Sequence, residues 1–167
     1  MVKKMKIHII GASGSGKTYL ASRLAEKNNI PCFDLDSIFW DNSASYGAKR
    51  SVDERNKLLG EILDNENWII EGVYYDWLDQ SFKAADVIYV LDIKTKICKR
   101  RIVKRFLRRK LKLEPGKKET VKSLIALLKW TDEYRNNNLV KIKKRLQSFP
   151  DKTIYLRSVK EVNEIIK

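Results

Sequence analysis

Apolar residues in this chain fall into short runs separated by longer amphipathic segments. Residues 6–10 form the first run, which is rich in β-forming residues and ends at Gly11. In residues 17–28, Leu20 and Leu24 recur one turn apart, so this segment is predicted to be a helix. The chain therefore begins with a strand, a loop and a helix. His8 lies inside the first strand and is expected to be a core residue, not a catalytic one.

The rest of the chain repeats this alternation of apolar runs and helical patterns. Ser51 is placed to cap a helix, with Glu54 completing a capping box, and Pro31 is confined to the start of a strand. The last long helical pattern is expected to be kinked or divided near Trp130. Further strands are predicted at 30–35, 68–71, 87–92 and 153–156, and further helices at 52–64, 94–112, 119–149 and 159–166. Residues 41–50 read as a loop, and Glu114, Pro115 and Gly116 break the helical pattern.

Five short strands that alternate with helices predict an open parallel sheet with right-handed crossovers and helices on both faces. Uninterrupted apolar runs, such as 68–70 and 87–91, suit strands that are buried on both faces of such a sheet. A length of 167 residues with 43% hydrophobic residues is enough for one compact core. We therefore expect one domain that covers residues 1–167.

The loop after the first strand carries the clearest chemical signal. It reads GASGSGKT and satisfies the pattern G-x-x-x-x-G-K-[ST] between a strand and a helix start. Glycines let the backbone N–H groups point at phosphate oxygens, Lys17 reaches the β- and γ-phosphates, and the Thr18 hydroxyl can ligate magnesium. We therefore expect a P-loop NTPase of three α/β/α layers that binds ATP with Mg²⁺. The expected nucleotide-binding residues are Gly11, Ala12, Ser13, Gly14, Ser15, Gly16, Lys17 and Thr18.

A P-loop also needs a carboxylate at the end of a neighbouring strand, and three candidates are present. Asp36 follows the second strand, Glu71 ends the third and Asp92 ends the fourth. Glu71 is preferred as the metal residue, because it is the last residue of a buried strand and precedes Gly72, where the chain can turn away. Asp92 is expected to be structural, as a cap for the helix that begins near Lys94.

Charge is distributed unevenly along the chain. The formal net charge is +14, and residues 94–147 hold 20 Lys/Arg against 4 Asp/Glu, which is +16 in that span alone. A nucleotide needs only a few cations, so the surplus suggests either a basic helical lid at about 94–147 or a surface that attracts polyanions.

The two cysteines form no disulfide framework and match no metal-ligand spacing, which fits a reducing compartment. The apolar run after the basic N-terminal residues is too short for a signal peptide, and no stretch approaches the roughly 18 apolar residues of a membrane helix. The protein is therefore expected to be soluble and cytoplasmic, without a membrane partner.

The residues described so far resemble the adenylate-kinase-like family of small P-loop kinases. Within it they resemble the group of DNA topology modulation (FlaR-related) proteins. The resemblance covers nearly the whole chain and rests on GASGSGKT, FDLDSIFW (33–40), WIIEGVY (68–74), ADVIYVLD (85–92), the arginine series after Cys98 and IYLRS (154–158).

The resemblance implies roles for several residues. Glu71 and Gly72 would serve the metal-bound phosphates. Arg101 and Arg105 have the R-x-x-x-R spacing of a lid that closes over the triphosphate, although a solvated basic face is the alternative. Arg135 resembles a further phosphate-clamping arginine. Asp36 would orient or deprotonate an acceptor hydroxyl, as in related small-metabolite kinases, and the alternative is a loop or capping aspartate. By resemblance alone, the region from 157 to 159 would contact adenine.

The chain also departs from nucleoside monophosphate kinases. Those proteins have an arginine after the acid of the second strand and another in a G-x-x-R motif after the third strand. Here these positions carry aromatic residues and no arginine, the aromatics being Phe39, Trp40, Tyr74, Tyr75 and Trp77. The aromatics can equally be core or lid packing.

Three functions follow as hypotheses. The first is an ATP-dependent kinase for a small acceptor, with Lys17, Arg101, Arg105, Asp36 and Arg135 as catalytic residues. The second is a nucleotide-regulated nucleic-acid-binding protein that uses the basic span. The third is a simple NTPase that works as a switch.

Overall fold

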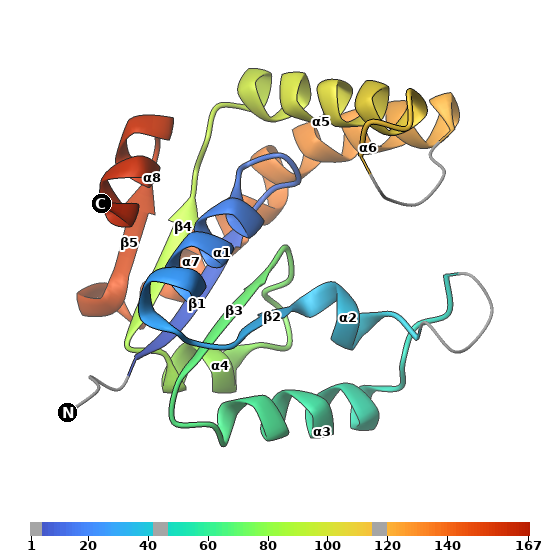
Figure 1. The fold of residues 1–167 in the computed structure, drawn as a ribbon. Helices are drawn as coiled ribbons and strands as arrows, with labels where there is room; N and C mark the ends of the chain where they lie inside the picture. Colours follow the sequence, from blue (N-terminus) through green and yellow to red (C-terminus); the bar gives the residue numbers. More distant parts are fainter. Residues whose placement is uncertain (1–4, 42–46, 115–119) are drawn as a thin grey trace.

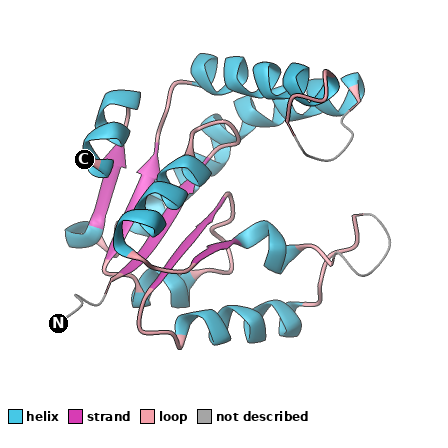
Figure 2. Cartoon of the chain, in the orientation of Figure 1, coloured by secondary structure: helices cyan, strands magenta, loops and turns pink. Residues whose placement is uncertain are grey.

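The computed structural model describes residues 5–41, 47–114 and 120–167. Part of the predicted loop at 41–50, and Pro115, Gly116 and Glu119, lie outside the described residues. The described chain forms one five-stranded sheet with helices along both sides (Figures 1 and 2). This is the predicted α/β arrangement.

All strand pairs in the sheet are parallel, in the order β2-β3-β1-β4-β5. The strands are β1 (Lys6–Gly11), β2 (Cys32–Asp34), β3 (Trp68–Gly72), β4 (Val87–Leu91) and β5 (Thr153–Leu156). The chain leaves β1 toward the β2 side of the sheet and leaves β4 toward the β5 side. Such a reversal opens a crevice at the carboxyl ends of the strands, which is where α/β sheets bind ligands.

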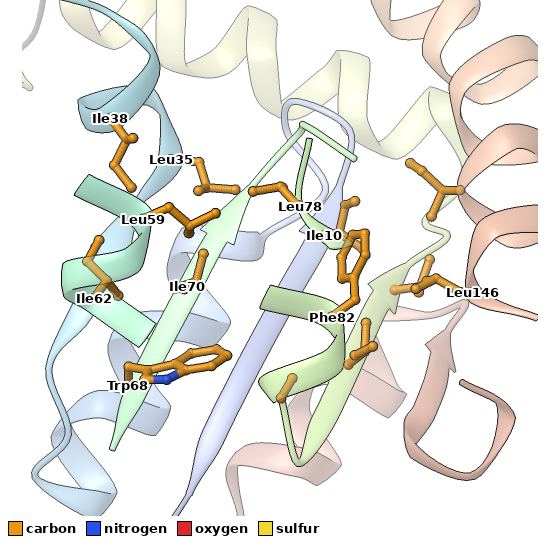
Figure 3. Close-up of a cluster of buried hydrophobic side chains, with 14 of the residues drawn as sticks. Ile10, Leu35, Ile38, Leu59, Ile62, Trp68, Ile70, Leu78, Phe82 and Leu146 are labelled. Carbon is orange, nitrogen blue, oxygen red and sulfur yellow. The ribbon is translucent and has the colours of Figure 1, made fainter. Parts of the chain in front are cut away.

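Alternate residues of the central strands belong to two separate hydrophobic cores. Ile10 and Ile70 belong to one cluster of buried side chains, together with Phe82 and Leu146 (Figure 3). Ile9 and Ile69 belong to a second cluster on the other side. Because successive side chains of a strand point to opposite faces, one sheet with two cores makes three layers.

The helices divide between these two cores. Leu20, Leu24 and Val162 from α1 and α8 pack in the second cluster, whereas Leu59 and Phe82 from α3 and α4 pack in the first. The helices are α1 (Lys17–Asn28), α2 (Leu35–Phe39), α3 (Val52–Leu63), α4 (Asp79–Ala84), α5 (Thr95–Lys110), α6 (Val121–Glu133), α7 (Leu139–Leu146) and α8 (Val159–Ile166). Ser51 and Glu54 form the predicted capping box of α3.

Two local predictions need correction. The second strand was expected to be buried at 30–35, but β2 has three residues at the edge of the sheet, with Cys32 and Asp34 exposed. The segments at 35–39 and 79–84 were not predicted as helices, because each is too short to show a helical period. The predicted division of the long helical stretch near Trp130 is confirmed, because a π-helical turn, Tyr134–Asn138, separates α6 from α7. A π turn has no sequence signal of its own.

His8 is fully buried in β1, as expected for a core residue. Its Nδ1 atom lies 2.8 Å from Ser81 Oγ, and its ring meets Phe82 edge-on with ring centroids 4.7 Å apart. Burial lowers the pKa of His8 from 6.5 to about 3. The folded protein therefore holds this imidazole in its neutral form.

A pH dependence of stability follows. Below about pH 6.5 the unfolded chain binds a proton at His8 that the folded chain excludes, so the free energy of unfolding should fall as pH drops from about 6.5 toward about 3. The slope from this group approaches about 1.4 kcal/mol per pH unit. Urea unfolding at pH 7 and pH 5.5 measures it. His8 is the sole histidine, so His8→Leu should lose this part of the slope, and an unchanged slope would contradict the assignment.

Candidate active site

The P-loop lies between β1 and α1. Two of its glycines occupy positions that would be strained for a residue with a side chain. Gly14 has φ +74° and Gly16 has φ +104°, both in the left-handed region. A Cβ atom at Gly14 would lie 2.5 Å from the carbonyl oxygen of Cys98 in α5. Gly14 is therefore required both by its backbone conformation and by the close approach of α5.

Lys17 follows the loop and is only 8% exposed. Its Nζ donates to the Ala12 carbonyl oxygen at 3.1 Å. Burial lowers the Lys17 pKa, and the nearby carboxylates of Glu71, Asp36 and Asp34 partly oppose this shift. An ammonium group has three N–H donors, and buried charge calls for an anionic partner. A phosphate group meets that need.

Ser15 supports the same assignment. Its Oγ is buried and has no hydrogen-bond partner among the residues that the structure describes. Ser15 lies in the loop just before α1, where N–H groups and the helix dipole favour an anion. The residues present therefore fit the phosphates of a nucleotide.

Thr18 and Glu71 meet next to this loop. The Thr18 hydroxyl donates to Glu71 Oε1 at 2.7 Å, and Glu71 is 4% exposed at the end of β3. Burial raises the Glu71 pKa, against the opposing influence of Lys17 and of the Thr18 hydrogen bond. A hydroxyl and a carboxylate at this distance are an oxygen donor pair that suits Mg²⁺.

Asp34 is a site residue that the sequence reasoning missed. It pairs with Glu71 in the β2–β3 register and lines the same cleft. Partial desolvation at the edge of the cleft raises the pKa of Asp34. The signal available in the sequence was the pair Asp34 and Asp36. A helix N-cap needs only one acid, so two acids at the end of a strand beside a P-loop indicate a further role.

Within the described ranges, no group of three or more His, Cys, Asp or Glu side chains could hold a metal ion. A magnesium site here would therefore combine oxygen atoms of Thr18 and Glu71 with the phosphate oxygens of the nucleotide. Asp34 would lie nearby. This is the usual composition of Mg²⁺ sites that serve phosphate transfer.

Asp36 lies in α2 and is held by an aromatic residue from the loop after β3. The Tyr74 hydroxyl donates to Asp36 Oδ1 at 2.7 Å, and burial together with this bond raises the Tyr74 pKa far above its ordinary value. Tyr74 is itself stacked on Phe39, with ring centroids 4.5 Å apart at 20°.

One cleft of about 990 Å³ is lined by Ser15, Lys17, Thr18, Asp34, Asp36, Glu71 and Tyr74. One wall is built from the P-loop, Asp34, Asp36, Trp40 and the segment from Glu71 to Tyr74. The opposite wall comes from α5 and α6, the helices of the predicted basic lid. Its lining residues are Arg101, Ile102, Arg105, Arg109, Leu127 and Trp130.

Arg101 and Arg105, predicted as a lid pair, both face this cleft. Arg101 donates from Nη1 to the carbonyl oxygens of Gly14 at 3.3 Å and Ser15 at 3.0 Å. It therefore contacts the P-loop backbone directly. Arg109, one turn beyond Arg105, is a third cleft arginine that the sequence reasoning did not single out, although the four-residue spacing continues to it.

Arg135 is placed elsewhere. Its Nη1 lies 3.1 Å from Asp92 Oδ1 and donates to the Ile93 carbonyl oxygen at 3.2 Å. Lys143 donates to the other oxygen of Asp92 at 2.7 Å. Arg135 is not among the residues that line the cleft. Asp92 is structural, as expected, but it anchors these two cations. It does not cap α5, whose N-cap is Lys94 without a side-chain bond.

The region predicted to contact adenine lies at the far end of the same cleft. Val159 lines it, together with Val162, Asn163 and Tyr19. Ser158 caps α8 by accepting from the Glu161 N–H, and the Arg157 N–H donates to Glu161 Oε2. Apolar side chains beside the P-loop suit the flat face of a base.

Comparison with known proteins identifies the family of this chain. The AAA domain family matches residues 7–122, which is more than half of the chain, so the protein belongs to this family. The uncharacterised protein YqaC of Bacillus subtilis (strain 168) is 35% identical over 89 residues, which cover 53% of this chain and 49% of that relative. The match thus spans about half the length of that relative.

Solved structures agree on the fold. A gluconokinase from Sinorhizobium meliloti 1021 aligns with a TM-score of 0.57 at 15% identity, over 98% of this chain and 87% of that one. A sugar kinase from Janibacter sp. HTCC2649 gives 0.54 at 17%, over 98% and 90%. A shikimate kinase from Bacteroides thetaiotaomicron gives 0.53 at 18%, over 97% and 94%. At such identities the likeness establishes a small P-loop kinase fold and nothing about the reaction.

Among residues 5–41, 47–114 and 120–167, no helix combines the length and the apolarity needed to cross a bilayer.

The contact between the P-loop and α5 yields a prediction. Gly14→Ala should abolish nucleotide binding, because alanine is strained at this φ and its Cβ would collide with the Cys98 carbonyl. Gly60→Ala in α3 is the matched control, because a Cβ there meets no atom within 4 Å. Isothermal titration with ATP and Mg²⁺ compares the two. Wild-type affinity in a folded Gly14→Ala protein would refute the role of Gly14.

Proposed function

We propose that this protein binds ATP with Mg²⁺ and transfers the γ-phosphoryl group to a hydroxyl of a small acceptor. The observation that carries the proposal is the presence of two kinds of group in one cleft. Lys17 and the P-loop occupy one part, and Asp36, held by Tyr74, faces the same space. The fold shared with small kinases supports the proposal.

The roles of the residues follow from the chemistry. Phosphoryl transfer depends mainly on positioning and on neutralisation of charge. Lys17 and Arg105 would bind phosphate oxygens, and Arg101 would keep the P-loop in shape. Bound magnesium would supply further charge neutralisation beside Thr18 and Glu71. Arg135 would act from outside the cleft, through Asp92.

Asp36 would serve the acceptor. Its second oxygen would accept the hydroxyl proton while the acceptor oxygen bonds to the γ-phosphorus and the bond to the β–γ bridging oxygen breaks. Tyr74 holds the other oxygen of Asp36, so the carboxylate keeps one orientation. We further propose that residues 1–167 act as one kinase-like domain and that the chain belongs to the DNA topology modulation (FlaR-related) group, on the motifs quoted above.

A substitution at Asp36 distinguishes the kinase hypothesis from the NTPase hypothesis. Asp36→Asn should lower phosphoryl transfer about 100-fold or more, with ATP affinity largely kept, because it removes the proton acceptor. Lys17→Ala should abolish ATP binding and therefore both activities. The assay is transfer from labelled ATP, with and without EDTA, to a panel of nucleosides, nucleotides and small hydroxyl metabolites.

The control is Asp64→Asn at the exposed end of α3, which should match the wild type. If no acceptor is phosphorylated above the water background while ATP is still hydrolysed, the NTPase hypothesis replaces the kinase.

The positive charge of residues 94–147 motivates nucleic-acid binding as a second candidate. The structure assigns part of this charge to other partners: Lys99 pairs with Asp132, Arg145 with Asp79, and Arg135 and Lys143 with Asp92. Lys96, Arg100 and Lys104 remain on the exposed side of α5. These residues are the surface that a polyanion would contact.

This second candidate predicts that duplex or single-stranded oligonucleotides bind with an affinity that falls steeply as salt rises. Fluorescence anisotropy from about 0.05 to 0.2 M salt measures this dependence. A triple variant, Lys96→Gln, Arg100→Gln and Lys104→Gln, should then weaken binding. Absence of binding at about 0.1 M salt removes the candidate.

A further inference from the structure

Trp40 comes directly after α2, and its backbone is fixed to the residue that the reaction would use as a base. The Trp40 N–H donates to the Asp36 carbonyl oxygen at 3.0 Å, and Arg50 Nη1 donates to the Trp40 carbonyl oxygen at 2.8 Å. Trp40 also forms an antiparallel bridge with Lys49. Trp40 and Asp36 both line the cleft, so the end of α2 brings the indole and the carboxylate to the same wall.

The Tyr74 hydroxyl is hydrogen-bonded to both of these side chains. It donates to Asp36 Oδ1 at 2.7 Å. Burial and this bond raise the Tyr74 pKa, and a second bond, to the Trp40 side chain, opposes the rise. A bond that favours the phenolate is one in which the phenol oxygen is the acceptor. Trp40 therefore donates to Tyr74, and Tyr74 donates to Asp36.

The chemistry of the indole fixes the direction of this hydrogen-bond chain. An indole N–H can only donate, and a hydroxyl has a single proton to donate. The Tyr74 oxygen accepts from Trp40, so the Tyr74 proton is directed at the carboxylate of Asp36. Because hydrogen bonds in a chain polarise one another, the bond from Trp40 also makes the Tyr74 hydroxyl a stronger donor.

Packing among the aromatic rings holds this arrangement in place. Phe39 stacks on Tyr74 with ring centroids 4.5 Å apart, and it meets Trp40 edge-on with centroids 5.0 Å apart. The Arg55 guanidinium lies 4.9 Å from the Phe39 centroid and 5.3 Å from the Trp77 centroid. A cation over an aromatic face is attracted to it, so Arg55 helps to fix the ring that packs against both Tyr74 and Trp40.

We propose that Trp40 is a positioning residue, which directs the Tyr74 hydroxyl at Asp36 and thereby fixes the orientation of the carboxylate that receives the acceptor proton. The proposal rests on the kinase function proposed above. Asp36 is exposed, so packing alone does not orient its carboxylate. A general base has to stay within hydrogen-bond reach of the proton that it removes, and the chain from Trp40 supplies that constraint.

A double-mutant cycle tests whether Trp40 acts through Tyr74. Trp40→Phe removes the indole N–H and should lower kcat for transfer from labelled ATP about 3- to 10-fold, as for the loss of one hydrogen bond. Tyr74→Phe removes a hydrogen bond to a charged group and should lower kcat at least as much. In the Tyr74→Phe background, Trp40→Phe should change kcat by less than about twofold, because its hydrogen-bond partner is already gone.

The assay uses the panel of nucleosides, nucleotides and small hydroxyl metabolites described above. Isothermal titration with a non-hydrolysable ATP analogue and Mg²⁺ shows that each variant is folded, and the affinity should stay within about twofold of the wild type. Trp77→Phe is the matched control, because the Trp77 indole N–H is buried without a hydrogen-bond partner among the residues that the structure describes. It should leave kcat within about twofold of the wild type.

NMR of protein labelled with ¹⁵N at the tryptophan indoles detects the hydrogen-bond chain without any acceptor. The Trp40 indole signal is the one that Trp40→Phe removes. It should move upfield and exchange faster with solvent in Tyr74→Phe, because the N–H loses its acceptor. It should also shift in Asp36→Asn, because Tyr74 then faces a neutral amide in place of a carboxylate.

The outcomes separate the two proposals. Four results would each overturn the positioning role: wild-type kcat in Trp40→Phe, an equal defect in Trp77→Phe, a Trp40→Phe defect that keeps its size in the Tyr74→Phe background, or a Trp40 indole signal that Tyr74→Phe leaves unchanged. An indole signal that depends on Tyr74 and Asp36, with no acceptor of the panel phosphorylated, would uphold the hydrogen-bond chain and overturn the kinase function.

Discussion

The burial of the Lys17 ammonium group is the constraint around which the site is organised. Burial lowers its pKa, and three carboxylates on neighbouring strand ends act against that shift. Glu71 and Asp34 come from adjacent strands in register, and Asp36 follows two residues after Asp34, in the first turn of α2. Burial raises the pKa of Glu71, and partial desolvation raises that of the more exposed Asp34, so the cluster holds both signs of charge at a desolvation cost. Anionic phosphate and a divalent cation would relieve both sides of that cost.

The rest of the structure supports this cluster from two directions. From one side, α5 touches the P-loop so closely that only glycine fits at Gly14, and Arg101 bonds to two carbonyls of the loop. From the other side, Phe39 stacks on Tyr74, and Tyr74 holds Asp36. In the basic span, α5 therefore contacts the P-loop directly. Because α5 contacts Gly14 and Ser15, a movement of α5 would also displace the P-loop. The two walls of the cleft are coupled in this way.

The chain also shows how one basic segment serves several purposes. Of its many cations, one row lines the cleft, others are structural partners of Asp92, Asp132 and Asp79, and another set is exposed on α5. Net charge alone cannot distinguish these uses, because it counts charges and ignores the direction of each side chain. The same limit explains Arg135, which shares the basic composition of the row on α5 but lies against Asp92 and Ile93.

The sequence by itself determined the features that depend on local spacing. The P-loop, the central strands, the capping box at Ser51 and Glu54, and the R-x-x-x-R pair are all readable because each is fixed by residues close together in the chain. The structure agrees with the sequence about where these features lie. The three-layer fold followed from the order of these elements, since parallel strands joined by helices have few ways to pack.

Only the tertiary structure decided which distant residues share the cleft. The addition of Asp34, the hold of Tyr74 on Asp36, the place of Arg109 in the row and the position of Arg135 outside it all depend on how strands and helices far apart in sequence come together. The edge position of β2 and the π turn at Tyr134–Asn138 belong to the same class. The physical reason is that a side chain's partners are set by packing between elements, whereas the hydrophobic period along the chain records only which face of its own element each residue occupies.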